Sequence, residues 1–247
     1  MTPTILITGA TSGLGLALAE AYAATSRLVL IGRKPLAELE NDLFSPQTYC
    51  QCDLSKPDCA EVIAAFLERH GIDNLELLIH NAGLGYYGKP ETQSAESIDE
   101  LLNVNLHAPM LITHKLLPYL KKAGGKLVFI SSISADLPAA DYAVYSATKA
   151  ALGGFARNLG LELGDAVRVQ MLYPGAIRTD MHAKSGVPAG KFKPETFPSV
   201  EEVAQQAVRA ISTDAPNVTL GFSNKLLRAA GRYLAAPLDT VVRMIGR

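Results

Sequence analysis

The chain has 247 residues, of which 48% are apolar and 19% charged, with 23 Lys and Arg against 24 Asp and Glu. That length suits one large domain or two small ones with a sizeable buried core, and the apolar content argues against disorder. The net charge of −1 gives no electrostatic basis for nucleic acid as the main partner.

The first 19 residues carry no charge and contain Gly9, Gly13 and Gly15. The stretch is nearly long enough to span a membrane, but the glycines interrupt it and it lacks the basic start of a signal peptide. We therefore expect a short buried strand, a glycine loop and the start of a helix. No other uncharged apolar run approaches spanning length, so the sequence predicts a soluble protein.

Short β-rich runs alternate with longer helical patterns along the chain. Several of the short runs are continuously apolar, as strands buried on both faces of a parallel sheet must be. The alternation predicts an α/β fold, a single-domain Rossmann-like doubly wound parallel sheet of about seven strands with helices on both faces. The predicted strands are residues 4–8, 28–31, a segment around Tyr49, 75–79, 126–130, 167–172 and 218–222, and the predicted helices include 14–24, 59–70, 97–120 and 142–163.

No Pro-, Gly- and Ser-rich linker divides the chain into two domains. We expect one domain over residues 1–223, with residues 224–247 as an extension of it. The longest irregular stretch, residues 180–198, follows a late strand, where sheets of this type bind ligands. Its length favours a mobile substrate lid over inert surface.

The three cysteines, Cys50, Cys52 and Cys59, include no CxxC pair. Their odd number and spacing argue against both a disulfide framework and a structural zinc site. We expect these side chains to pack in the core, with no metal bound, in a protein of the reducing cytoplasm.

The first predicted strand runs into Thr8-Gly9-Ala10-Thr11-Ser12-Gly13-Leu14-Gly15 and then into a helix. Glycines let the backbone turn sharply and approach a pyrophosphate, and the helix N-terminus supplies free N–H groups and positive potential. Tight packing would also explain three glycines. Their position between a strand and a helix favours nucleotide binding.

Tyr145 and Lys149 lie four residues apart in the predicted helix 142–163. Positions i and i+4 share one face of a helix, so the phenol and the ammonium can point into one site. A phenol titrates near pH ~10, so proton exchange near neutrality needs a nearby cation. Ser132, thirteen residues before Tyr145, ends a predicted strand, where its hydroxyl can hydrogen-bond a substrate oxygen. Each feature alone would be a surface pair or a turn serine.

Together these motifs resemble the short-chain dehydrogenase/reductase family, in its short single-domain branch, over residues 8–204. The glycine loop has the family's TGxxxGxG spacing, and Tyr145 and Lys149 form its YxxxK motif. Residues 174–179, Pro-Gly-Ala-Ile-Arg-Thr, resemble its PGxxxT segment. His80-Asn81-Ala82-Gly83 matches its NNAG motif, except that His80 replaces the first Asn, and we interpret His80 as a packed or hydrogen-bonded histidine rather than a catalyst.

The resemblance implies a catalytic tetrad of Asn105, Ser132, Tyr145 and Lys149. Tyr145 would exchange the proton, Ser132 would hold the substrate oxygen, and Lys149 would lower the pKa of the tyrosine and contact the nicotinamide ribose. Asn105 would hold a water near the lysine. Asn103 is the competing candidate, but helix register and the family pattern favour Asn105.

The resemblance also implies how a dinucleotide binds. Asp53 would contact the adenine, Asn81–Gly83 would form the wall beside the adenosine, and Ile177 and Thr179 would contact the nicotinamide carboxamide and the pyrophosphate. The implied cofactor-binding residues are Gly9, Thr11, Ser12, Gly13, Leu14, Gly15, Arg33, Asp53, Leu54, Asn81, Ala82, Gly83, Tyr145, Lys149, Pro174, Gly175, Ile177 and Thr179.

The choice of dinucleotide depends on the end of the second strand, where NAD-binding proteins carry an acid for the ribose 2′-OH. Gly32 occupies that position here, followed by Arg33 and Lys34. A guanidinium can bind a 2′-phosphate bidentately, so NADP(H) is favoured and NAD(H) is the alternative. Ser12 is not basic, so only one of the family's two usual NADP signatures is present.

We therefore expect NADP(H)-dependent interconversion of a ketone or aldehyde and an alcohol. The alternatives are a non-catalytic dinucleotide-sensing or scaffold protein and, less in keeping with the short chain, an extended sugar-nucleotide epimerase. Family resemblance implies a homodimer or homotetramer. The expected pocket is apolar and suits a small lipophilic carbonyl or alcohol substrate; its candidate lining residues are Leu84, Tyr86, Ile133, Ala139, Ala140, Tyr142, Ala176 and Met181.

Residues 222–247 contain five basic residues and one acid, a net charge of +4. A helix starting near Asn224 would place Lys225, Arg228 and Arg232 on one side and an apolar stripe on the other, and Pro237 should break it. Such a segment can lie on an anionic membrane surface. We favour the alternative in which the apolar stripe closes over the substrate pocket or packs against a neighbouring subunit.

Overall fold

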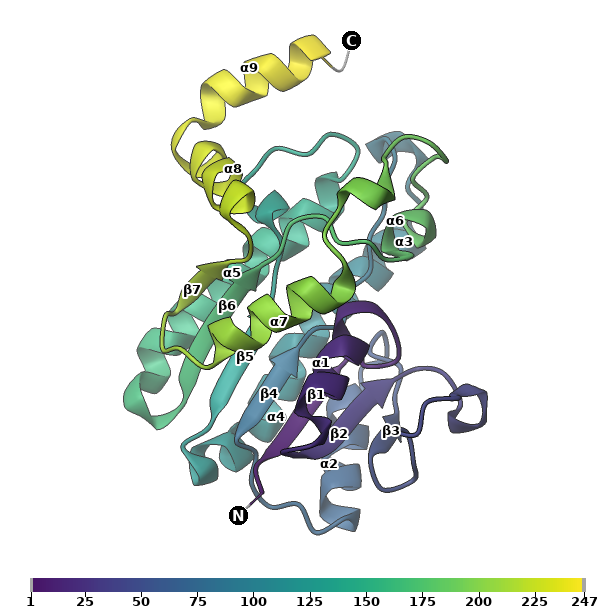
Figure 1. The fold of residues 1–247 in the computed structure, drawn as a ribbon, viewed down its shortest axis with the longest axis vertical. Helices are drawn as coiled ribbons and strands as arrows, with labels where there is room; N and C mark the ends of the chain where they lie inside the picture. The colour runs from purple at the N-terminus through teal and green to yellow at the C-terminus, as the bar shows by residue number, and fades with distance from the viewer. Residues whose placement is uncertain (1, 246–247) are drawn as a thin grey trace.

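The computed structural model describes residues 2–245, which form a seven-stranded parallel sheet with the strand order β3-β2-β1-β4-β5-β6-β7 (Figure 1). β1 is the first strand of the chain but lies in the middle of the sheet, so successive strands are added first on one side of it and then on the other. The strands are β1 (Thr4–Thr8), β2 (Arg27–Gly32), β3 (Tyr49–Gln51), β4 (Leu77–His80), β5 (Lys126–Ile130), β6 (Arg168–Tyr173) and β7 (Asn217–Thr219).

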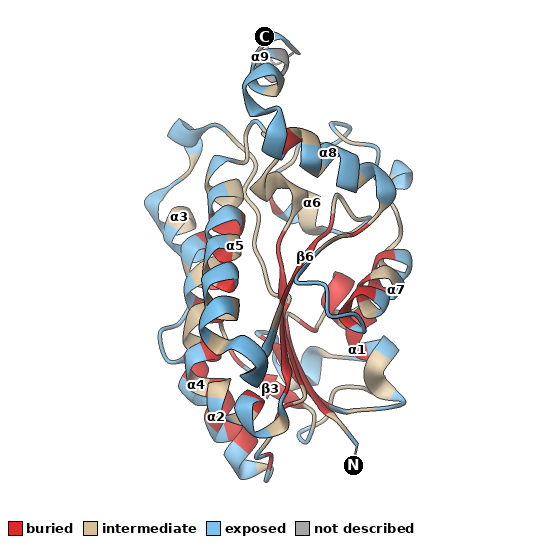
Figure 2. Cartoon of the chain, turned by 90° about the vertical axis from the view of Figure 1, so that its left-hand side faces the viewer, coloured by how far each residue is buried: buried red, intermediate tan, exposed pale blue. Residues whose placement is uncertain are grey.

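Helices cover both faces of this sheet, because its strands carry apolar residues on both sides; β1, β4 and β5 are buried at every position (Figure 2). One buried cluster lies under α2, α4 and α5, and the other lies under α1 and α7. The helices are α1 (Gly13–Ala23), α2 (Cys59–Arg69), α3 (Ala95–Leu102), α4 (Ala108–Ala123), α5 (Ala143–Leu163), α6 (Met181–Lys184), α7 (Val200–Ile211), α8 (Phe222–Tyr233) and α9 (Ala235–Ile245).

Short helical turns complete the connections between these elements. One of them, η3, is a π-helical turn between α3 and α4, and such turns occur frequently at functional sites. The turns are η1 (Leu36–Glu38), η2 (Pro90–Thr92), η3 (Asn103–His107), η4 (Ile133–Ala135), η5 (Gly164–Ala166) and η6 (Pro194–Thr196).

The predicted fold class is confirmed, and β1 and β5 have the predicted bounds. Two predicted elements are wrong in detail. The single helix expected over residues 97–120 is divided into α3, η3 and α4, and the last strand ends at Thr219, because Gly221 (φ +85°) turns the chain into α8.

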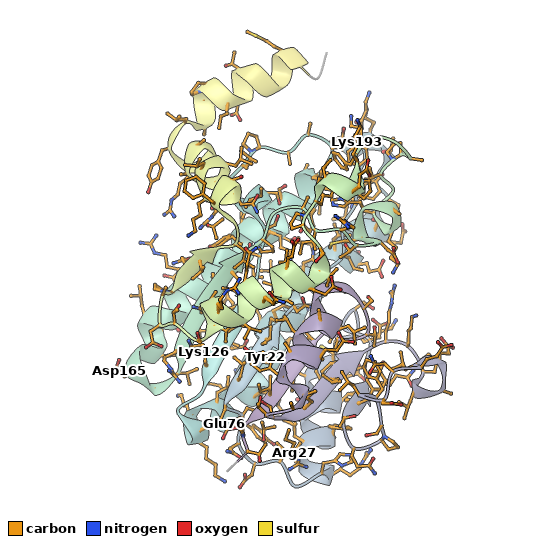
Figure 3. All side chains as sticks on the ribbon, viewed as in Figure 1. Tyr22, Arg27, Glu76, Lys126, Asp165 and Lys193 are labelled. Atoms are coloured by element: carbon orange, nitrogen blue, oxygen red, sulfur yellow. The ribbon has the colours of Figure 1, made fainter. Side chains whose placement is uncertain are left out.

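The carboxyl ends of the strands lie together at one end of the molecule. In Figure 3, Arg27, Glu76 and Lys126 mark the amino end of the sheet, and Lys193 lies at the opposite end, in the segment between α6 and α7. Loops that carry predicted site residues follow each of the strands β1 to β6. Parallel strands therefore deliver these loops to one edge of the sheet, where ligands bind in sheets of this type.

The predicted C-terminal helix exists, but its details differ from expectation. It is interrupted at Leu234, where the backbone leaves the helical region (φ −124°, ψ 34°), whereas Pro237 lies inside the first turn of α9, a position that proline tolerates. The apolar stripe does not close over the substrate pocket, because Phe222, Leu226 and Tyr233 face solvent. Among residues 2–245, no helix combines the length and the apolar character needed to cross a membrane.

Candidate active site

The glycine loop leaves β1 and enters α1 through two residues in the left-handed region, Gly9 (φ +66°) and Gly13 (φ +53°). A Cβ atom at Gly9 would lie 2.8 Å from Cα of Ala82, so only glycine fits the close approach of the two loops. The first turn of α1 contains no acid, and Ser12 makes no side-chain cap. Its N–H groups and positive helix dipole therefore suit a bound anion such as a pyrophosphate.

The segment after β4 fastens this loop. Thr8 Oγ1 accepts hydrogen bonds from the N–H groups of Asn81 (3.0 Å) and Ala82 (3.1 Å). In return, Asn81 Nδ2 donates to the carbonyl oxygens of Thr8 (3.0 Å) and Gly9 (3.2 Å). Asn81 thus holds the shape of the glycine loop through its amide group, and this contact explains why an asparagine follows the strand.

His80 precedes Asn81 but serves the core. Its side chain is buried, its Nε2 lies 2.9 Å from Thr113 Oγ1, and its ring stacks on Phe129 at 4.9 Å between centroids. Burial lowers the pKa of His80 to about 3, so the ring is neutral at physiological pH. This is the packed, hydrogen-bonded histidine expected from the sequence.

The two residues of the YxxxK motif share one face of α5. Lys149 is buried, and its Nζ donates a 3.0 Å hydrogen bond to the carbonyl oxygen of Ile130 at the end of β5. The same nitrogen lies 5.8 Å from the centroid of the Tyr145 ring. Burial lowers the pKa of Lys149 to about 8, so the ammonium remains the main form at neutral pH. The motif therefore places a cation beside the phenol.

Ser132 lies two residues after the end of β5, beside Tyr145. Burial raises the pKa of Tyr145, and a hydrogen bond with Ser132 opposes that rise. Ser132 Oγ also accepts hydrogen bonds from the N–H (3.2 Å) and the hydroxyl (3.0 Å) of Ser134. Two donors on the same oxygen leave the Ser132 proton for donation toward the tyrosine or a substrate oxygen. Ser134 was not predicted from the sequence, where the only signal for it is the Ser-x-Ser spacing.

Asn105 lies in the π-helical turn and is 1% exposed. Its Oδ1 accepts from the N–H of Leu84 (2.7 Å), and its Nδ2 donates to the carbonyl oxygen of Leu84 (2.9 Å) and to Thr148 Oγ1 (3.1 Å). Thr148 in turn donates to the carbonyl oxygen of Tyr145 at 2.7 Å. Asn105 therefore connects the loop after β4 with α5, whereas the competing candidate, Asn103, is only half-buried.

Gly83 completes the contact between these groups. A Cβ atom there would lie 3.2 Å from Lys149 Nζ and 3.5 Å from Asn105 Oδ1. The structure thus brings all four predicted tetrad residues to one place. Ser131, which was also missed, donates from its hydroxyl to the carbonyl oxygen of Lys149 at 3.0 Å and ties α5 to the end of β5.

The residues predicted to choose the dinucleotide lie at the end of β2. Arg33 is exposed, and its Nη1 lies 3.6 Å from Glu100 Oε1 of α3. A Cβ atom at Gly32 would lie 2.5 Å from Thr11 Cγ2 and 2.9 Å from the hydroxyl of Tyr49, so this position is crowded by the glycine loop. The exposed Arg33 side chain thus lies next to the glycine loop, with Glu100 as its present partner.

Asp53 and Leu54 follow β3 on the same edge. Asp53 Oδ1 accepts from the N–H (3.0 Å) and the hydroxyl (2.8 Å) of Ser55. Partial burial acts to raise the pKa of Asp53, but these hydrogen bonds hold it below its usual value. The carboxylate is therefore ionised and oriented, while Leu54 packs in the core.

The segment after β6 returns to the glycine loop. A Cβ atom at Gly13 would lie 3.5 Å from Thr179 Cγ2, so the predicted pyrophosphate contact lies against the first turn of α1. Arg178 points away from this site and donates to the carbonyl oxygens of Glu195 (3.0 Å) and Phe197 (3.1 Å). These hydrogen bonds therefore connect the predicted lid, residues 180–198, to residues 174–179.

The predicted lid lies against the loop that follows Gly83. The N–H of Tyr87 donates to the carbonyl oxygen of Ser185 at 2.7 Å, and a side chain at Gly85 would collide with Ser185. The Tyr87 ring packs edge-on against Tyr142 at 5.2 Å, and Tyr142 lies 5.9 Å from Tyr145. Of the two adjacent tyrosines, the predicted Tyr86 instead hydrogen-bonds Thr92, so Tyr87 forms the aromatic wall.

The described residues contain no group of three or more His, Cys, Asp or Glu side chains placed to hold a metal ion. The three cysteines are buried, with no disulfide between them, and burial raises the pKa of Cys50 to about 11 and that of Cys52 to about 12. The thiols are therefore protonated at neutral pH and pack as small apolar side chains.

Comparison with known proteins places these motifs in context. The family model described as short chain dehydrogenase matches residues 3–188. The 11-beta-hydroxysteroid dehydrogenase 1A of Arabidopsis thaliana is 33% identical over 186 residues, which cover 72% of this chain and 53% of that protein. Dehydrogenase/reductase SDR family member 4 of Oryctolagus cuniculus is 31% identical over 184 residues, 70% of each chain. The chain thus spans about half the length of the hydroxysteroid dehydrogenases that it matches.

Solved structures share the fold over nearly the whole chain. A short-chain dehydrogenase from Streptomyces avermitilis has a TM-score of 0.82 at 26% identity, covering 100% of this chain and 98% of that chain. A short-chain dehydrogenase from Sphingobium yanoikuyae, solved in complex with NADPH, has a TM-score of 0.77 at 27% identity and covers 99% and 94%.

Proposed function

Since the chain belongs to the short-chain dehydrogenase/reductase family, we propose that it is an NADP(H)-dependent oxidoreductase that interconverts a ketone or aldehyde and the corresponding alcohol. The main support for the proposal is that the side chains of Tyr145, Lys149 and Ser132 lie close together. The buried ammonium lies on the same helix face as the phenol, and the serine hydroxyl lies close enough to that phenol to oppose the rise in its pKa.

The residues around this point fit a dinucleotide. The uncapped first turn of α1 and the glycine loop suit a pyrophosphate, and Thr179 lies against that turn. Asp53 presents an oriented carboxylate on the adenosine side. The NADPH-bound relative from Sphingobium yanoikuyae supports the choice of cofactor, as does the end of β2, where Gly32 and Arg33 stand in place of the acid of NAD-binding proteins.

Bound NADP(H) would supply or accept the hydride at the substrate carbon. Tyr145 Oη would give its proton to the substrate oxygen during reduction and take it back during oxidation. The Lys149 ammonium stabilises the phenolate that this transfer leaves. The Ser132 hydroxyl holds the substrate oxygen, and Ser134 orients that hydroxyl by donating to Ser132 Oγ.

Asn105 maintains the arrangement around the tyrosine. Its amide joins Leu84 of the substrate-side loop to Thr148 of α5, so the lysine, the tyrosine and the pocket wall keep their relative positions. The aromatic wall of Tyr87 and Tyr142 favours an uncharged, lipophilic substrate. A homodimer or homotetramer remains a prediction from the family resemblance, and a cytoplasmic location remains a prediction from the sparse, unpaired cysteines.

The proposal is tested by following NADPH oxidation with a panel of ketones and aldehydes, and NADP⁺ reduction with the matching alcohols. Tyr145→Phe should lower kcat at least about a thousandfold, a loss of about 4 kcal/mol, while the Kd for NADPH stays within about twofold. Tyr22→Phe, which removes a phenol hydroxyl from α1, should keep full activity. Turnover by Tyr145→Phe above about a tenth of the wild-type rate would contradict the assignment. NADPH binding without turnover of any carbonyl or alcohol would favour the non-catalytic alternative.

A further inference from the structure

The last two helices of the described chain form a projecting unit, which we call the C-terminal arm, residues 222–245. α8 lies against β7 and η4, and α9 extends from it away from the sheet (Figures 1 and 2). None of the residues predicted for catalysis or cofactor binding lies in this arm. The exposed side of the arm is therefore assigned no part in the proposed reaction.

The polar side of α8 faces the protein. Arg228 Nε donates to Asp136 Oδ2 at 2.6 Å, its Nη1 donates to Thr219 Oγ1 at 3.1 Å, and its guanidinium carbon lies 3.3 Å from the centroid of the Tyr173 ring. One turn later, Gly231 is buried so closely against the Asp136–Leu137 backbone that a side chain there would collide with it. These contacts fix the rotation of α8 about its axis.

With the polar side inward, the apolar side of α8 faces solvent. Phe222 is 76% exposed, Leu226 60% and Tyr233 77%, and they recur at i, i+4 and i+11 along one line of the helix. Leu227 and Leu234 beside that line are exposed as well. Of the nine large apolar side chains that are exposed among the described residues, six belong to the C-terminal arm. Such a concentration marks an interaction surface.

Basic residues border this apolar line. Lys225 and Arg232 are exposed and lie on the same flank of α8, about 80–100° from the middle of the line at 100° per residue. Arg243 adds a third basic residue to the arm's sequence, and Asp239 is its only acid. The arm therefore presents apolar and aromatic groups outward with cations beside them.

We propose that the C-terminal arm binds an anionic lipid surface. Phe222, Leu226 and Tyr233 would enter the interfacial region, and Lys225 and Arg232 would lie among the acidic headgroups. The two helices have 12 and 11 residues, which suits a segment lying on a membrane rather than crossing it. A second copy of the chain fits this face less well. In a twofold-symmetric pair of arms the same surface patch meets itself, which would bring cations against cations with no acid of α8 to pair with them.

The test is flotation of the full chain with vesicles. We expect binding to phosphatidylcholine vesicles that contain about a third phosphatidylglycerol, little binding to phosphatidylcholine alone, and loss of binding when NaCl is raised from about 0.05 to about 0.5 M. Leu226→Gln should weaken the partition coefficient at least about tenfold. The pair Lys225→Gln and Arg232→Gln should weaken it about 25-fold, at about fivefold for each cation.

Matched controls come from exposed residues elsewhere. Leu161→Gln changes a leucine that is 77% exposed on α5, and the pair Arg157→Gln and Arg209→Gln removes two exposed arginines from α5 and α7. Both should bind as the unchanged protein does, and circular dichroism should show native helix content in every variant. Absence of flotation at low salt, equal binding to neutral vesicles, or equal losses in the controls would overturn the proposal. So would light scattering in which Leu226→Gln converts a larger assembly into a smaller one without any vesicle binding, because the arm would then cover a second copy.

Discussion

Replacing Arg33 with alanine tests the proposed cofactor preference. In the structure its side chain is 67% exposed, and it pairs with the exposed Glu100 at 3.6 Å. An exposed pair of this kind contributes about 0–1 kcal/mol, so its loss should leave the fold intact. A charge-assisted contact between a guanidinium and a phosphate contributes about 1.5–3 kcal/mol. We therefore expect Arg33→Ala to lower kcat/KM for NADPH about 10- to 150-fold and that for NADH less than about threefold.

The assay is steady-state oxidation of both reduced cofactors with the best carbonyl substrate. Arg157→Ala, which removes an exposed arginine from α5, is the control for a general loss of positive charge and should change neither value. Equal losses for NADPH and NADH in Arg33→Ala would refute the assignment of Arg33 to the 2′-phosphate. An unchanged kcat/KM for NADPH would refute it as well.

Three further changes test other parts of the argument. Gly32→Asp should move the NADPH-to-NADH ratio of kcat/KM at least about tenfold toward NADH. The control is Gly32→Ala, which introduces the same Cβ beside Thr11 without a carboxylate. Identical ratios in the two variants would show that the carboxylate has no effect. Lys149 has a folded pKa of about 8 against about 10.4 unfolded, so its buried charge opposes folding below pH 8 and the penalty disappears as pH rises through 8 to 10.4. The quantity to measure is accordingly the unfolding free energy of Lys149→Met minus that of the unchanged protein, and this difference should be about 3 kcal/mol larger at pH 7 than at pH 10.5. A difference that does not vary with pH would contradict the lowered pKa of Lys149. Arg228→Met should lower the unfolding free energy by about 2–4 kcal/mol, because it leaves Asp136 half-buried and unpaired. A double-mutant cycle with Asp136→Asn measures the coupling between the two side chains. A coupling energy below about 0.5 kcal/mol would show that the pair contributes little.

The local pattern predicted most of the fold because each strand is a short apolar run between turn residues. Residues 4–8 and 126–130 illustrate this, since their bounds follow directly from the apolar run. The tetrad was predicted through the family's motifs, and the structure brings those four residues together. Its supporting contacts were not predicted. Ser134 matters only because η4 turns its hydroxyl back onto Ser132, and no periodic pattern describes such a turn.

Two outcomes depended on contacts between distant parts of the chain. The π-helical turn at 103–107 follows from the hydrogen bonds of Asn105 to Leu84 and Thr148, which lie 21 and 43 residues away. The orientation of α8 follows from the hydrogen-bonded ion pair between Arg228 and Asp136, which lies 92 residues earlier. A helical wheel separates the apolar side of α8 from its basic side, but it contains no information about which side meets the protein. The expectation that the apolar side closes over the substrate pocket was therefore wrong, whereas its packing against a neighbouring subunit stays a prediction.

The way Asn105 holds Leu84 has a consequence for how the substrate pocket can change. The asparagine amide accepts from the N–H and donates to the C=O of the same residue, so it copies the pairing that a neighbouring strand would provide. Because only the main chain of residue 84 is held, its side chain is not constrained by this interaction. The side chain at position 84, which we predict to line the substrate pocket and which packs against the core cluster, can therefore change while the backbone beside Lys149 stays in place. Under the proposed function, substrate preference could then diverge without disturbing Tyr145 and Lys149.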